Sequence, residues 1–220
     1  MASDEASPID VTVGVSVLGK TESNAYGTLK LSRSVGNGMA VDLMGTMGSR
    51  KRFAGTGFAI RHGGSDIELR LRRETDGNAS GSLGLAIAST PAGRSAPFLT
   101  LSGETRMAGN DKTSVSLVLR AATRVSSSLY GTGFRADTKL NNMDAYFEGL
   151  WVSGSENTYS INTGKREQRA VYRLGVRPQL GGKLKFELGV TNQLGRTTGM
   201  SLTPGLGKGL GGYVELTTRF

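Results

Sequence analysis

Residues 9–18 read IDVTVGVSVL, and apolar and polar side chains alternate along this stretch. In an extended chain, successive side chains point to opposite faces of a sheet. One face carries Ile9, Val11, Val13, Val15 and Val17, and the other carries Asp10, Thr12, Gly14 and Ser16. The pattern predicts a β-strand with one apolar and one polar face.

The same alternation recurs along the chain. It is clear in DIELRLRR (66–73), in SVSLVLR (114–120) and in GKLKFELGV (182–190). Turn-forming sequences such as VGNG (35–38) and TDGN (75–78) lie between such runs. Strands of about 10 residues joined by short turns are typical of an up-and-down meander.

Fourteen segments qualify as strands. They lie near residues 9–18, 26–33, 38–48, 52–61, 66–73, 80–90, 97–107, 112–122, 127–138, 143–153, 157–163, 169–178, 183–193 and 211–220. The segment at 157–163 has the weakest pattern. Single-chain bacterial barrels have even strand numbers, so a barrel made from these segments has either 12 or 14 strands.

The composition limits the remaining fold classes. The chain has 220 residues, 37% of them hydrophobic, with 33 glycines, 5 prolines and no cysteine. This length suits a single all-β domain, which we place at residues 9–220, after a disordered segment at residues 1–8. Disulfides and thiolate metal sites are excluded, and no apolar run is long enough for a membrane-spanning helix.

The N-terminus MASDEASPID contains no secretory signal. The chain is therefore either cytoplasmic or a mature form that begins with a new methionine. Alternating strands alone do not decide between these locations, because a soluble sheet and a membrane barrel share the pattern. Aromatic residues placed toward strand ends favour the membrane barrel, whose two interfaces carry aromatic girdles. The residues assigned to these girdles are Tyr26, Phe53, Phe98, Tyr130, Trp151, Tyr172, Tyr213 and Phe220.

The last eight residues, YVELTTRF (213–220), end on an aromatic residue, with Val214, Leu216 and Phe220 on one face. This segment resembles the last strand of the Gram-negative outer-membrane β-barrel (porin-like) class. Thr218 stands where that class prefers a larger apolar residue. The resemblance implies that these three residues form the membrane-insertion strand, which pairs with the first strand to close the barrel. It also implies a location in the bacterial outer membrane, contact with outer-membrane lipid and recognition by the barrel-assembly machinery.

Few residues suggest catalysis or cofactor binding. His62 is the single histidine and lies in the turn RHGGSD, near Ser65 and Asp66. A catalytic triad needs convergent geometry that neighbours in a turn rarely provide, so we expect an exposed histidine and no enzyme. One histidine and no cysteine predict no metal site. The glycines of GKGLGG (207–212) precede no helix, so we expect no bound dinucleotide and no other cofactor.

The formal charge is +9, from 27 Lys and Arg against 18 Asp and Glu. Nucleic-acid binding is disfavoured because the charges are spread over most strands and aromatic residues are scarce. If the apolar faces contact lipid, the charged faces line a lumen. The predicted pore-lining residues are Lys30, Arg70, Arg72, Arg106, Arg120, Arg135, Arg173, Arg177, Lys183, Lys185, Glu68, Glu104, Glu148 and Glu187. These charges either neutralise one another in cross-strand ladders or leave surplus cations along an anion path.

The sequence therefore predicts an all-β, antiparallel up-and-down transmembrane barrel with short turns and a narrow pore. The leading hypothesis is a small porin for passive diffusion of small anionic solutes. Small basic porins for acidic oligosaccharides are similar in length and lumen charge. The alternatives are a non-conducting structural or adhesive barrel, an outer-membrane hydrolase and a soluble β protein. Neither the oligomeric state nor an open or plugged lumen follows from the sequence.

Overall fold

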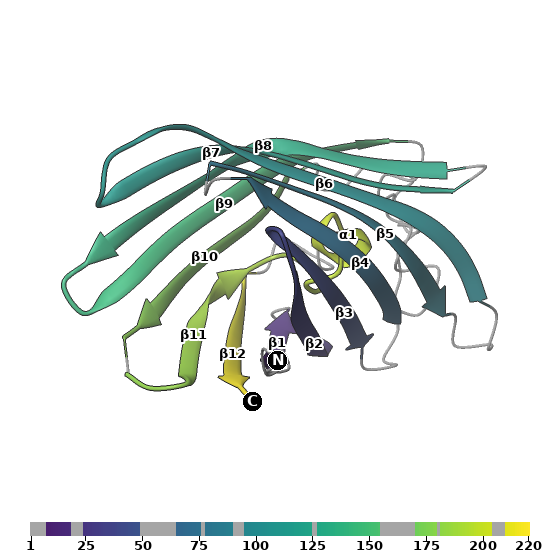
Figure 1. Ribbon diagram of the computed structural model, residues 1–220. Helices are drawn as coiled ribbons and strands as arrows, with labels where there is room; N and C mark the ends of the chain where they lie inside the picture. Colours follow the sequence, from purple (N-terminus) through teal and green to yellow (C-terminus); the bar gives the residue numbers. More distant parts are fainter. Residues whose placement is uncertain are drawn as a thin grey trace, which may run out of the picture.

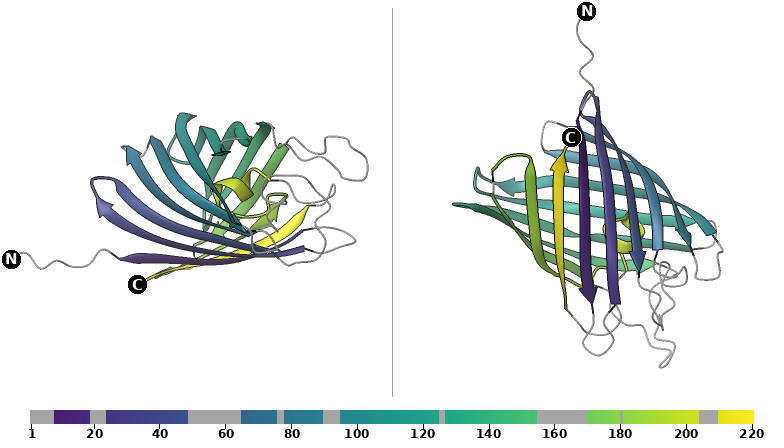
Figure 2. Two further views of the ribbon diagram at one scale, coloured as in Figure 1. Left: turned by 90° about the vertical axis from the view of Figure 1, so that its right-hand side faces the viewer. Right: turned by 90° about the horizontal axis from the view of Figure 1, so that it is seen from below.

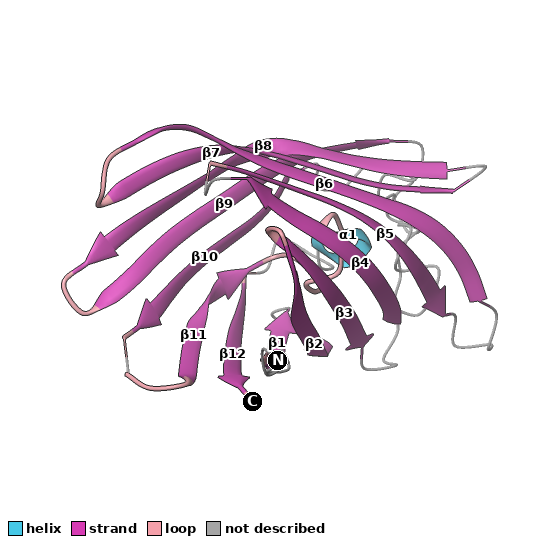
Figure 3. Cartoon of the chain, in the orientation of Figure 1, coloured by secondary structure: helices cyan, strands magenta, loops and turns pink. Residues whose placement is uncertain are grey.

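The computed structural model describes residues 8–18, 24–48, 65–75, 78–89, 95–124, 127–154, 170–179, 181–203 and 210–220. These residues form a barrel of antiparallel strands, with one four-residue helix (Figures 1 and 3). The elements are β1 (Ile9–Leu18), β2 (Asn24–Gly36), β3 (Met39–Gly48), β4 (Ser65–Thr75), β5 (Ala79–Ser89), β6 (Ser95–Gly109), β7 (Thr113–Arg124), β8 (Ser127–Leu140), β9 (Met143–Gly154), β10 (Ala170–Pro178), β11 (Leu184–Thr191), α1 (Thr198–Ser201) and β12 (Gly211–Arg219).

Each strand pairs with its neighbours in the chain, and β12 pairs with β1 to close the sheet. The expected strands at 52–61 and 157–163 lie outside the described residues. Because β3 pairs directly with β4, and β9 with β10, the closed sheet has 12 strands. The predicted fold class is confirmed, with the smaller of the two predicted strand numbers.

The seam between β1 and β12 is regular. Val13 lies opposite Leu216, and Val15 opposite Val214. Backbone hydrogen bonds join Ile9 and Phe220 in both directions, at 3.1 Å and 3.0 Å. The pairing predicted for the last strand is confirmed, and it leaves neither strand with a free edge here.

The apolar faces point outward. Val13 on β1 is 53% exposed, Leu69 on β4 is 55% exposed and Leu101 on β6 is 58% exposed. A soluble barrel buries such side chains, whereas a membrane barrel presents them to lipid. Among the described residues, no helix is long and apolar enough to span a bilayer.

The expected aromatic girdle is only partly correct. Tyr130, Trp151 and Phe220 are exposed on the outer face, and Tyr172 is half-buried. Tyr26, Phe98 and Tyr213 instead point into the barrel and are buried. The reason is strand parity, since each of these three shares the inward face of its strand with polar residues. Phe53 lies outside the described residues.

The two ends of the barrel differ. At the end where β1 begins and β12 ends, described turns are short, as at Asn37 and Gly38, which adopt φ of 52° and 70°. The longest connections lie at the other end, namely those from β3 to β4, from β9 to β10 and from β11 to β12, although only two residues separate β7 from β8. In outer-membrane barrels, short turns face the periplasm and long loops face outward. We assign the end that holds both Ile9 and Phe220 to the periplasmic side.

After β11 the chain turns into the barrel instead of continuing along its rim. Residues 192–203, which we call the inner segment, contain α1 and lie within the ring of strands (Figure 2). Leu194, Met200 and Leu202 of this segment are buried. The sequence indicated only a loop before the final strand, so the inner segment was not predicted.

Candidate functional site

The lumen contains a cavity of about 720 Å³ on the periplasmic side of the inner segment. Its wall reaches from Asp10 and the turn residue Gly182 to Arg196 and Thr198. The inner segment thus bounds this cavity at the end away from the periplasmic turns. The cavity wall is the candidate functional site because inward-facing charged side chains from many strands meet there.

Hydrogen bonds hold one side of the inner segment to β4. The Thr197 hydroxyl donates to both carboxylate oxygens of Asp66 at 2.8 Å. The backbone N–H of Thr198 donates to Glu68 at 2.6 Å, and its hydroxyl donates to the same carboxylate at 2.8 Å. Thr100 on β6 adds another donor to Glu68 at 2.7 Å. We call these contacts the threonine latch, because threonine donors hold both carboxylates.

Apolar contacts hold the inner segment from other sides. Leu202 belongs to a buried cluster with Phe98 and Leu150. Met200 belongs to another with Leu18 and Tyr26. Gly131 on β8 leaves the space that Leu202 fills, because a Cβ there would clash with the Leu202 side chain. The inner segment therefore packs as part of the folded interior.

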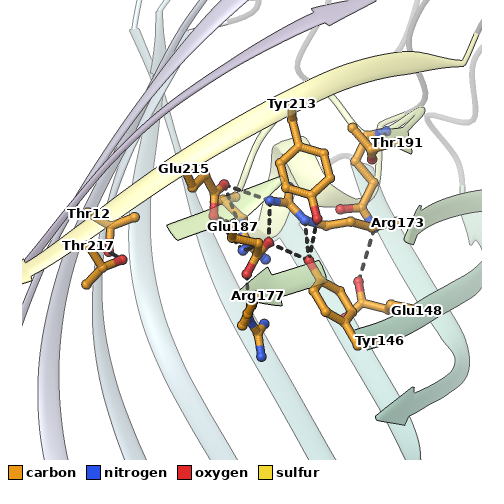
Figure 4. Close-up of polar contacts among 12 residues, drawn as sticks. Thr12, Tyr146, Glu148, Arg173, Arg177, Glu187, Thr191, Tyr213, Glu215 and Thr217 are labelled. Atoms are coloured by element: carbon orange, nitrogen blue, oxygen red, sulfur yellow. Dashed lines mark hydrogen bonds and ion pairs between the residues drawn. The ribbon is translucent and has the colours of Figure 1, made fainter. Parts of the chain in front are cut away.

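Arg196 fixes the inner segment to β11 and β12. Its guanidinium Nη2 lies 2.6 Å from a carboxylate oxygen of Glu215 and 2.9 Å from one of Glu187. Arg173 bridges the same two carboxylates, at 2.8 Å and 3.0 Å, and Arg177 reaches Glu187 at 2.7 Å. We call these five residues the arginine–glutamate cluster (Figure 4). It contains three cations and two anions.

Two tyrosines complete this cluster. The Tyr146 hydroxyl donates to Glu187 at 2.6 Å and accepts from the Nε of Arg173 at 2.6 Å. The Tyr213 hydroxyl lies 2.9 Å from that of Tyr146, and the Arg173 guanidinium stacks 3.5 Å from the Tyr213 ring centre. Burial lowers the pKa of Arg196, but the carboxylates of Glu215 and Glu187 outweigh it and raise that pKa well above its ordinary value. The guanidinium is therefore permanently charged.

A second group of charges lies on β2, β3 and β4. Asp42 is fully buried and lies 3.0 Å from Arg70, 3.5 Å from Lys30 and 3.5 Å from Arg72. We call these four residues the Asp42 cluster. Arg72 also contacts Glu74, which is exposed nearer the periplasmic rim. Within the described part of the chain, the Nε atoms of Arg70 and Arg72 have no hydrogen-bond partner.

Cations are in excess on the cavity wall. The wall contains seven basic residues, Lys30, Arg70, Arg72, Arg120, Arg177, Lys185 and Arg196, and five acidic residues, Asp10, Glu104, Asp144, Glu187 and Glu215. Asp42 lies buried behind three of these cations, and the buried Glu148 lies 2.6 Å from Arg120, so these two carboxylates offset the difference. Cations are in local excess at the Asp42 cluster, where three cations share one buried carboxylate.

The structure places the predicted pore-lining residues in three settings. Those on the cavity wall are Lys30, Arg70, Arg72, Glu104, Arg120, Arg177, Lys185 and Glu187. Those that point inward but are held by other side chains are Glu68, Arg135, Glu148 and Arg173. Arg106 and Lys183 are exposed near the periplasmic turns, and Arg106 donates to the Asn110 carbonyl.

The residues considered for catalysis do not assemble in the described part of the chain. His62 lies outside the described residues. Ser65 accepts a hydrogen bond from the Gly48 N–H, whereas Asp66 belongs to the threonine latch. Among the described residues, no group of three or more acidic, histidine or cysteine side chains is placed to hold a metal ion.

Sequence reasoning missed Arg196 and the threonine latch. The segment NQLGRTTGMSLT (192–203) has no strand alternation and is too short for an amphipathic helix. Unlike the glycine-rich stretch after it, the segment mixes apolar with hydrogen-bonding residues. This composition was the one available sign that it packs inside the protein. The strand faces could also have identified Tyr146 and Tyr213, since each alternates with inward-facing carboxylates.

No family model and no curated protein sequence matches this chain. Solved structures do match. The NanC porin has a TM-score of 0.63 at 7% identity, covering 96% of this chain and 100% of NanC. The KdgM porin has a TM-score of 0.59 at 11% identity, covering 96% and 99%. The translocator domain of the autotransporter NalP from Neisseria meningitidis has a TM-score of 0.51 at 11% identity, covering 97% and 88%.

At these identities the similarity concerns the fold. A closed barrel of 12 antiparallel strands with an apolar outer face is the architecture of outer-membrane proteins. The chain therefore has the predicted outer-membrane β-barrel class and the predicted location in the bacterial outer membrane.

Proposed function

We propose that this chain is a small outer-membrane porin that passes small solutes by diffusion and prefers anions, including acidic sugars. The observation that carries the proposal is the Asp42 cluster, where three cations face the cavity around one buried carboxylate. Lys30, Arg70 and Arg72 all line the cavity, where cationic side chains can bind the carboxylate or phosphate groups of a solute. The chain acts as a conduit in this proposal and catalyses no reaction.

The similarity to porin structures supports the channel part of the proposal. One matching structure is the KdgM porin in complex with disordered oligogalacturonate, with a TM-score of 0.61 at 11% identity. Oligogalacturonate is a polyanionic sugar. The charge excess on the cavity wall supports the same solute class for this chain, independently of that similarity.

Planar-bilayer recording under a salt gradient tests the proposal, because the reversal potential gives the ratio of anion to cation permeability. Replacing Arg70 and Arg72 by Glu should lower this ratio severalfold. Arg33→Glu is the matched control: it reverses a charge on β2, but Arg33 lies on the outer face, opposite Ile9 and Val41. An unchanged reversal potential in the Arg70 and Arg72 variant would contradict the anion path.

The inner segment supports a second candidate, a barrel that is closed at rest. It lies in the lumen, at the end of the cavity away from the periplasmic turns, and is held by the threonine latch and by Arg196. Inserted wild-type protein that stays silent, together with conducting Thr197→Val and Thr198→Val variants, would favour this candidate. Steady conductance of the wild type would exclude it.

We also propose that Val214, Leu216 and Phe220 form the insertion signal. All three are exposed on the outer face of β12, where a partner can reach them. Phe220→Ser should slow insertion by the purified barrel-assembly machinery, whereas Arg219→Ser, next to it on the inward face, should not. Equal insertion rates would contradict this role.

A further inference from the structure

The outer face of the barrel carries a groove that the channel function does not use. It has a volume of about 510 Å³ and lies across β3 to β6 near the periplasmic end. Its lining includes Leu71, Leu83 and Leu101, with Arg73 and Gly81 next to them. We propose that this groove binds one anionic glycerophospholipid from the periplasmic leaflet, with an acyl chain on the leucines and the phosphate on Arg73.

The strand register explains how the groove forms. Leu71, Leu83 and Leu101 lie opposite one another on three adjacent strands and point outward. The next outward-facing row toward the periplasmic end contains Arg73 on β4, Gly81 on β5 and Gly103 on β6. Arg73 lies opposite Gly81, and Gly81 lies opposite Gly103. On β4, β5 and β6, a row of three leucines is therefore followed by a row of one cation and two glycines, and Met39 on β3 lies opposite Arg73 in that row. Gly81 lines the groove beside the guanidinium, and Met39 adds an apolar side chain to the lining.

These glycines are not required by the packing of the sheet. A Cβ at Gly81 would approach nothing closer than the Ser102 carbonyl oxygen, at 3.9 Å, and a Cβ at Gly103 would lie 3.9 Å from the Ser80 oxygen. Larger residues would therefore fit sterically on both strands. The lack of a side chain at Gly81 leaves open space in the groove, where the row of leucines ends.

Charge complementarity identifies the occupant. Arg73 is exposed on the outer face, and no described residue forms an ion pair or hydrogen bond with its guanidinium group. An arginine on a lipid-facing surface is tolerated best near the interface, where lipid phosphates lie. Guanidinium binds phosphate through paired hydrogen bonds. The headgroup of an anionic lipid such as phosphatidylglycerol contains no ammonium group to compete for that phosphate, so we commit to anionic glycerophospholipids of this kind.

The volume is also appropriate for a lipid chain. It lies within the range of about 300 to 1,000 Å³ that is typical of small-molecule sites. The groove is shallow and open along the barrel wall. A site for an acyl chain needs this shape, because the lipid remains in the bilayer while it is bound. Since it faces away from the lumen, the inference is independent of the proposed porin function.

Native mass spectrometry of the full chain in detergent tests the proposal. The probes are phosphatidylglycerol and phosphatidylcholine with identical acyl chains. We expect wild-type barrels to retain one phosphatidylglycerol in preference to phosphatidylcholine. Arg73→Gln, which removes the charge, and Gly81→Phe, which fills the groove, should each weaken this retention at least tenfold. The matched control is Arg33→Gln, an outward arginine on β2 that does not line the groove.

Retention is compared among preparations whose unheated electrophoretic mobility is that of the folded barrel. Equal retention of the two lipids, or wild-type retention by both the Arg73 and Gly81 variants, would overturn the proposal. Equal loss in Arg33→Gln would also overturn it, because binding would then reflect the general charge of the outer face. The two groove variants act by different means, so failure of one to fold leaves the other to decide.

Discussion

The arginine–glutamate cluster and the Asp42 cluster use the same chemistry for different ends. In the first, guanidinium groups are closed in by two carboxylates, two tyrosines and the inner segment. In the second, three cations share one buried carboxylate. Cations that are balanced by carboxylates and enclosed by other side chains hold a structure together, whereas cations in local excess attract anionic solutes. Charge balance and enclosure, more than charge type, therefore distinguish the cluster that stabilises the barrel from the cluster that faces solutes.

Removing Arg173 should have the largest effect on this comparison. Arg173→Met leaves Glu187 and Glu215 buried with one cation fewer and leaves the Tyr146 hydroxyl without its donor. Breaking a buried ion pair typically costs about 3–5 kcal/mol. We expect a loss of this size in the free energy of unfolding, measured by urea titration in phospholipid vesicles. A variant as stable as the wild type would show that Arg196 and Arg177 suffice.

Arg196→Met should have the next largest effect, and mainly on conduction. It breaks the contacts of the inner segment with Glu215 and Glu187, while the threonine latch stays intact. The segment loses one of its polar attachments, and the cavity wall loses one cation. We expect single-channel conductance to rise severalfold and anion preference to fall. Conductance at the wild-type level would mean that the threonine latch and the other remaining contacts suffice to fix the segment.

Arg72→Gln should change selectivity with little effect on stability. Arg70 and Lys30 still neutralise Asp42, at 3.0 Å and 3.5 Å, and the Arg72 side chain is 28% exposed. Partly exposed ion pairs contribute about 0–1 kcal/mol. The reversal potential should shift toward cations by less than in the double charge reversal. A large loss of stability would place Arg72 with the scaffold residues instead.

Arg219→Gln should have the smallest effect of the four. Arg219 pairs with Asp10 at 2.7 Å, but both side chains are open to solvent at the periplasmic end. We expect no measurable change in unfolding or conductance. A clear change in either would mean that enclosure is not what separates the two clusters.

The sequence predicted the parts of this molecule that depend on local alternation. Val13 and Leu69 face outward as their strand patterns required, and the first and last strands pair as Phe220 indicated. The same parity rule, applied to Tyr213, would have placed it inward beside Glu215 and not in the outer girdle. The error arose because Tyr213 was assigned to the outer girdle as an aromatic residue near a strand end, and the alternation of faces along its strand was not applied.

The inner segment was beyond sequence reasoning for a physical reason. Thr197 is held by Asp66, 131 positions away in the chain, and Thr198 by Glu68, 130 positions away. No periodicity within residues 192–203 records such partners. Glu68 was predicted to face the lumen and Asp66 was placed in a turn near His62, but the partners of both depend on the closed barrel.

The seam between β1 and β12 has a kinetic consequence. Every other strand pair joins neighbours in the chain, whereas the hydroxyls of Thr12 and Thr217 meet across 205 positions. Hairpins between neighbours close short loops at little entropic cost, but the seam must close the longest loop in the barrel. We therefore expect strands β1 to β12 to form a curved open sheet before β12 pairs with β1. The pairing of β1 with β12 is also the one we expect to separate first when the barrel opens, since breaking it disrupts no hairpin.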